Sequence, residues 1–126
     1  MDKFYIPKNV VTKYAFATRV GYIPMNPNKV NQDTYILGPC IEGPENNSKH
    51  MFGVNDGHGQ FGHHVSGFIK EQLLAIVKDM LSRDHSDPNS DLPEESALAK
   101  KYEDLLQSAF LKCDQRLQDI SDKSKE

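Results

Sequence analysis

The stretch FGVNDGHGQFGHHVS, residues 52–66, places acidic, glycine and histidine residues between an apolar run and the start of a helical pattern. A strand ending at Asn55 puts Asp56 at the edge of a sheet, where its side chain can project into a cleft. Gly57 lets the backbone turn sharply and expose its carbonyl oxygen. A carboxylate and a carbonyl are the oxygen donors that Mg²⁺ and Mn²⁺ prefer. The turn therefore predicts a site for a hard cation.

Two further side chains fit the same chemistry. Asp33, in the sequence NQD before a predicted strand, can bring a second carboxylate to this edge. His58 supplies an imidazole, a group that can protonate a leaving group. An Asp-Gly pair alone is most often only a turn, but a turn has no need of an imidazole between two glycines. We do not favour a zinc cluster of His58, His63 and His64, because no cysteine is near and adjacent histidines on a helix point in different directions.

Hydrophobic periodicity predicts an α+β protein. Alternation in KYAFATRV, residues 13–20, predicts a strand. Two shorter strands are predicted at residues 34–37 and 50–55, and apolar residues three or four apart predict helices over about 61–81 and 93–122. Two helices and three strands leave apolar surface uncovered. We therefore expect helices packed on an antiparallel sheet that needs more strands.

Composition narrows the class of partner and the location. The 126 residues fit one domain, and 15 basic residues among 18 acidic ones, without a basic run, do not suggest a nucleic-acid partner. No apolar stretch approaches the roughly 20 residues that span a bilayer, and the N-terminus lacks a signal peptide's apolar centre. We expect no membrane association and a cytoplasmic or nuclear location, with Cys40 and Cys113 reduced.

The motifs together resemble a known family. KVNQDTYILGP followed by HMFGVNDGHGQFGHHVSGFIKEQL resembles the N-terminal catalytic motifs of the metal-dependent serine/threonine protein phosphatases of type 2C, over residues 14–74. The resemblance implies an αββα sandwich of four layers, with antiparallel sheets flanked by antiparallel helices. Residues 1–126 would be its incomplete, N-terminal part. It also implies hydrolysis of phosphoserine and phosphothreonine in proteins by a water that two Mg²⁺ or Mn²⁺ ions activate.

The resemblance assigns roles to five residues of this sequence. Asp56 is the carboxylate that bridges both ions, and Gly57 is a ligand through its carbonyl oxygen. His58 is the general acid for the leaving alkoxide. Asp33 supports the metal site directly or through water. Lys29 lies near the position of the family's phosphate-binding arginine, without the two-pronged fit of a guanidinium.

Two departures from the family leave alternatives open. Gln32 stands where many members carry a glutamate, which removes a charge and disfavours direct metal ligation. The aspartates that complete the family's site have no counterpart after residue 60, so we expect an N-terminal fragment or truncated product with weak or no activity alone. Unpaired sheet edges predict self-association. The alternatives are a non-catalytic phosphatase-like binding module, or a small domain of unrelated fold in which DGHG is only a turn.

Overall fold

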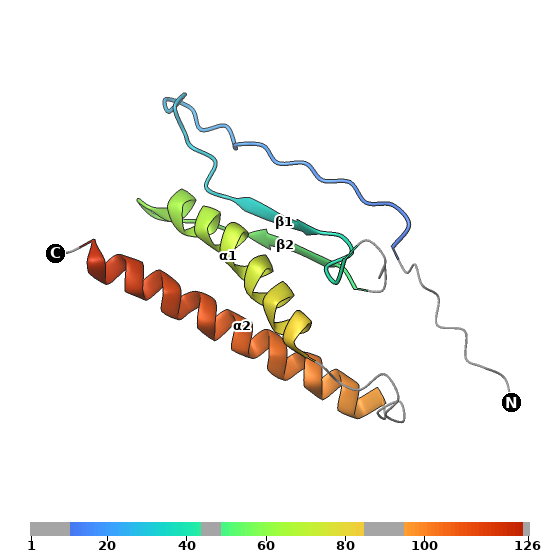
Figure 1. Ribbon diagram of the computed structural model, residues 1–126. Coiled ribbons are helices and arrows are strands. Elements are labelled where there is room, and N and C mark those ends of the chain that lie inside the picture. The colour runs from blue at the N-terminus through green and yellow to red at the C-terminus, as the bar shows by residue number, and fades with distance from the viewer. Residues whose placement is uncertain (1–10, 44–48, 85–94, 125–126) are drawn as a thin grey trace, which may run out of the picture. The chain divides into compact units, whose positions relative to one another are not determined.

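The computed structural model describes residues 11–43, 49–84 and 95–124. Its elements, in chain order, are the strands β1 (Thr34–Gly38) and β2 (Met51–Asn55) and the helices α1 (Gly62–Arg83) and α2 (Glu95–Lys123) (Figure 1). The chain divides into two compact units, Met1–Gly67 and Phe68–Glu126, which we describe separately. The described residues are thus mixed α and β, with one antiparallel pair of strands and two helices.

The first unit is built on the pairing of β1 with β2. Their register sets Thr34 opposite Asn55 and Ile36 opposite Gly53. Ile36 is only 2% exposed, and its side chain lies over Gly53, which offers a flat surface. Burial alternates along β2, as expected for a strand with one covered face. The strands lie within one residue of the ranges that the sequence predicts.

The strand predicted over residues 13–20 is wrong. These residues run as an extended segment that forms no strand (Figure 1). The ring of Phe16 instead lies 4.6 Å from that of Tyr35, and the ring of Tyr14 lies 5.2 Å from that of Phe52. Alternating apolar residues indicate contact on one side, and tilted ring contacts with the side chains of a sheet satisfy that pattern without hydrogen bonds between strands.

In the second unit, the part of α1 from Phe68 onward lies beside α2 (Figure 1). The guanidinium of Arg116 donates to Gln72 Oε1 over 2.8 Å, joining the two helices. The buried residues of the helices in this unit are Leu73, Ile76, Val77, Leu81, Ala109 and Cys113. Ala109 is fully buried.

The helices keep close to their expected ranges. α1 begins one residue after the expected start and ends two residues later than expected, and α2 ends at Lys123. The expected first turn of the second helix, at residue 93, lies outside the described residues. α2 leaves much of its apolar surface exposed, including Phe110 and Ile120. Within the described ranges, neither helix combines the length and apolar character needed to cross a membrane.

Candidate active site

The antiparallel pairing of β1 and β2 brings two carboxylates to one edge of the sheet. Because Thr34 pairs with Asn55, the residue before β1 and the residue after β2 become neighbours. These residues are Asp33 and Asp56, and both are exposed. They line one pocket of about 230 Å³ together with Gly57. The two acidic residues that the sequence singles out therefore line the same pocket.

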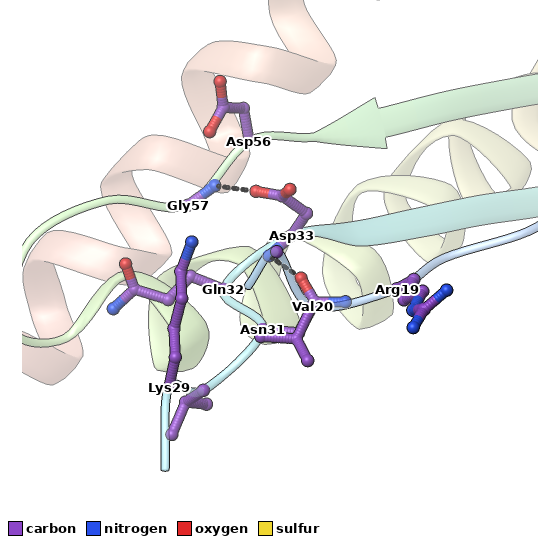
Figure 2. Close-up of a pocket in the computed structure, with 10 residues that line it drawn as sticks. Arg19, Val20, Lys29, Asn31, Gln32, Asp33, Asp56 and Gly57 are labelled. Atoms are coloured by element: carbon purple, nitrogen blue, oxygen red, sulfur yellow. Dashed lines mark hydrogen bonds between the residues drawn. The ribbon is translucent and has the colours of Figure 1, made fainter. Parts of the chain in front are cut away.

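The carboxylate of Asp33 faces the turn after β2. The amide nitrogen of Gly57 donates to Asp33 Oδ1 over 3.2 Å, while the carboxylate of Asp56 points away from Asp33 (Figure 2). The backbone nitrogen of Asp33 donates to Asn31 Oδ1 over 3.1 Å. This is an Asx turn, a local pattern that fixes the backbone just before β1. The backbone of Asp33 is thus fixed by Asn31, and its carboxylate in turn fixes the turn that follows β2.

Gly57 is packed so tightly that only glycine fits. A Cβ atom at this position would clash with the carbonyl oxygen of Gln32 and would lie 2.7 Å from that of Gly62. Both neighbours are backbone atoms, which cannot rotate aside. The glycine is therefore required by the close approach of three chain segments.

A network of hydrogen bonds ties the turn to β1 and α1. The side-chain amide of Gln32 donates to the carbonyl oxygen of Gly59 over 2.5 Å. The hydroxyl of Ser66 donates to the carbonyl oxygen of Gln32 over 2.5 Å. The hydroxyl of Thr34 donates to the backbone carbonyl oxygen of Ser66 over 2.7 Å. Sequence reasoning did not find Ser66, because a serine in an amphipathic helix reads as a solvent-facing residue. Here it is 1% exposed.

His58 lies between Gly57, which is bonded to Asp33, and Gly59, which is bonded to Gln32. His58 is exposed. It is not among the residues that line the pocket beside Asp33 and Asp56. The structure therefore brings together four of the residues that the resemblance singles out, Lys29, Asp33, Asp56 and Gly57, and places His58 on the adjoining turn.

Two cationic side chains line the same pocket. One is Lys29, the residue that the resemblance offers as a phosphate contact, and its ammonium would lie 3.3 Å from a Cβ atom at Gly21. Arg19 was not predicted, because it precedes Asp33 by fourteen residues and belongs to no motif. Its guanidinium offers the forked donor geometry that a lysine lacks. Figure 2 shows Arg19 and Lys29 on different sides of Asp33.

The donor set suits a hard cation but is small. Two carboxylates and the carbonyl of Gly57 are oxygen ligands of the kind that Mg²⁺ and Mn²⁺ take. In the described ranges, no group of three or more histidine, cysteine or acidic side chains is arranged to hold a metal ion. The residues present therefore fit part of a metal site.

The histidines at the start of α1 differ from expectation. The rings of His63 and His64 lie with their centroids 4.0 Å apart, so they do not point in separate directions. Among the residues that the structure describes, Nδ1 of His63 is buried and finds no hydrogen-bond partner. The two rings lie in the first turn of α1 and are tilted by 41° to each other.

Comparison with known proteins identifies a relative. The chain is 36% identical over 120 residues to "Probable protein phosphatase 2C 35" of Arabidopsis thaliana. The alignment covers 94% of this chain and 30% of the relative, so the chain spans about a third of the relative's length. No model of a protein family matches the chain, and no solved structure matches it either.

Proposed function

The chain belongs to the protein phosphatase 2C family, and on that premise we propose that it supplies part of the active site of a metal-dependent protein phosphatase. The substrates are phosphoserine and phosphothreonine side chains of proteins. One observation carries the proposal most directly. Asp33, Asp56 and Gly57 line a single pocket that Arg19 and Lys29 also line. Such a pocket can take both a metal ion and a phosphoryl group.

The acidic edge of the pocket would hold the metal. Asp56 and the carbonyl of Gly57 would be ligands, and Asp33 would support them from the other side of the turn. Two Mg²⁺ or Mn²⁺ ions, when bound, lower the pKa of a water molecule and neutralise the charge that develops on the phosphoryl oxygens. The hydrogen bond from Gly57 to Asp33 keeps the carboxylate and the turn in a fixed relation. Further carboxylates must come from outside the described residues.

The basic side chains and His58 act on the substrate. Lys29 and Arg19 attract the phosphoryl dianion, and the guanidinium can donate to two of its oxygens at once. His58, exposed on the adjoining turn, donates its proton to the leaving serine or threonine oxygen as general acid. In this proposal the β1–β2 pair is part of an αββα sandwich with four layers, and its unpaired edges are where further strands, or a second copy, add.

The test replaces Asp56 by Asn, which keeps the size of the side chain and removes its charge. Mn²⁺ binding to the 126-residue chain is measured by calorimetry, and hydrolysis of p-nitrophenyl phosphate is measured beside it. We expect an affinity loss of roughly tenfold or more, since affinity for hard cations follows the charge and number of ligands. The matched control is Asp104→Asn, which removes an exposed carboxylate of α2. Equal Mn²⁺ binding by the two variants would contradict the proposal.

One observation favours a second function, that of a non-catalytic module that binds a partner. It is the small donor set, with fewer than three clustered metal-binding side chains in the described part of the chain. That function predicts a folded protein that binds neither Mn²⁺ nor the aryl phosphate. The same titration therefore separates the two functions.

A further inference from the structure

Gln32 and Asp33 are consecutive residues that grip the turn on both sides of His58. Asp33 Oδ1 accepts from the backbone nitrogen of Gly57 over 3.2 Å. Gln32 Nε2 donates to the carbonyl oxygen of Gly59 over 2.5 Å. The two contacts cross 24 and 27 residues of sequence, so they are tertiary contacts and not properties of the turn itself.

The backbone of Gln32 is itself anchored, so its side chain starts from a fixed point. Its carbonyl oxygen accepts from the hydroxyl of Ser66, which is almost fully buried in α1. The backbone carbonyl of Ser66 in turn accepts from the hydroxyl of Thr34, the first residue of β1. The side chain of Gln32 thus links the turn to a point that a helix and a strand hold in common.

The turn needs such support. Gly59 has a φ of +79°, in the left-handed region, which glycine adopts without strain. Glycine is also the residue with the most backbone conformations open to it, and Gly57 and Gly59 flank the imidazole. Without external contacts, the position of His58 would be spread over many backbone conformations.

We propose that Gln32 is a positioning residue, whose side-chain amide fixes the Gly57–Gly59 turn and thereby the direction of His58. The effect on catalysis rests on the proposed function, in which His58 is the general acid. It also gives a reason for an amide at this position. A glutamate of the same length cannot donate to the carbonyl of Gly59, and would set acceptor against acceptor. The donor that Gln32 supplies is thus a specific contribution, separate from the charge that it lacks.

The experiment compares Gln32→Met and Gln32→Glu with Gln60→Met in the 126-residue chain. Both Gln32 variants keep the length of the side chain and lose the donor, while Gln60 is an exposed glutamine in the following turn. Amide hydrogen exchange is measured by NMR for residues 57–60. We expect roughly five- to tenfold faster exchange in both Gln32 variants, as for the loss of one hydrogen bond, and no change in Gln60→Met. Unchanged exchange in both Gln32 variants would overturn the positioning role.

A second measurement does not depend on whether the variants fold. In the unaltered chain, the hydrogen bond predicts a scalar coupling between Gln32 Nε2 and the carbonyl carbon of Gly59. Its absence would overturn the proposal. Where hydrolysis is measurable, Gln32→Met should lower kcat by roughly tenfold or more with KM unchanged, because a misdirected acid slows chemistry and not binding.

The two proposals fail in different ways. Exchange and coupling are measured without metal or substrate, so their failure removes the role of Gln32 and leaves the phosphatase proposal in place. If the unaltered chain neither binds Mn²⁺ nor hydrolyses the aryl phosphate, the phosphatase proposal fails, and with it the catalytic meaning of Gln32, whatever the exchange rates are.

Discussion

Replacing Gly57 by Ala adds one methyl group at the most tightly packed point of the site. The new Cβ would overlap the carbonyl oxygen of Gln32 and approach that of Gly62 to 2.7 Å, closer than real Cβ contacts. Neither backbone atom can turn away, so the segment before β1 and the start of α1 must move apart. That movement also stretches the hydrogen bond between Gly57 and Asp33. The variant should lose both stability and the shape of the pocket.

The size of the effect follows from the geometry. Overpacking a well-packed position costs typically about 1–3 kcal/mol, and we expect about 2–3 kcal/mol here because both clashes are with backbone. For a domain of this size, each 1 kcal/mol shifts the melting temperature by roughly 4–8 °C or somewhat less. Urea unfolding followed by circular dichroism should show a lower midpoint with an unchanged slope.

The matched control is Gly67→Ala, in α1. A Cβ atom there meets nothing within 4 Å, and its backbone is helical. We expect this variant to gain about 0.5–1 kcal/mol, since alanine has a higher helix propensity than glycine. The same chemical change should therefore move the urea midpoint in opposite directions at the two positions. A Gly57→Ala chain as stable as the unaltered one would refute the close packing on which the site depends.

Two further predictions concern the pair of helices. Ala109→Leu should destabilise the chain by about 1–3 kcal/mol in urea unfolding, because a fully buried alanine leaves no room for a larger side chain, whereas Ser108→Leu on the exposed face should change little. Burial raises the pKa of the Cys113 thiol, against the smaller lowering effect of Arg116. A raised pKa in the folded state stabilises the fold fully below the unfolded pKa of about 8.5, and this contribution is lost as the pH rises through the folded pKa. The urea midpoint should accordingly fall more steeply above about pH 8.5 for the unaltered chain than for Cys113→Ala, and equal slopes would contradict the assignment.

The acidic part of the site was predictable because it depends on local signals and simple pairing. An aspartate directly after one strand and another directly before its antiparallel neighbour must meet at one edge, and the pairing of Thr34 with Asn55 brings this about. Asn31, two residues before Asp33, forms an Asx turn. Its sequence position could have predicted this turn, which is not among the predictions made from the sequence.

The error over residues 13–20 has a physical cause. Period-two alternation records which side chains face an apolar surface, and Tyr14 and Phe16 do face the rings of Phe52 and Tyr35. Whether the backbone also forms a ladder depends on the distance and direction of the neighbouring strand. The sequence pattern carries no information about either.

From the sequence alone came the two strands, the two helices and the chemistry of the Asp-Gly-His turn, since each depends on residues close together in the chain. Only the tertiary structure placed Arg19 in the pocket, joined Gln32 to Gly59 and buried Ser66 beneath them. The two hydrogen bonds join residues 27 and 34 positions apart, the place of Arg19 depends on a loop's path, and no local propensity specifies them. Periodicity reports which face of a segment is covered, whereas a hydrogen bond between distant segments depends on where the whole chain has brought them.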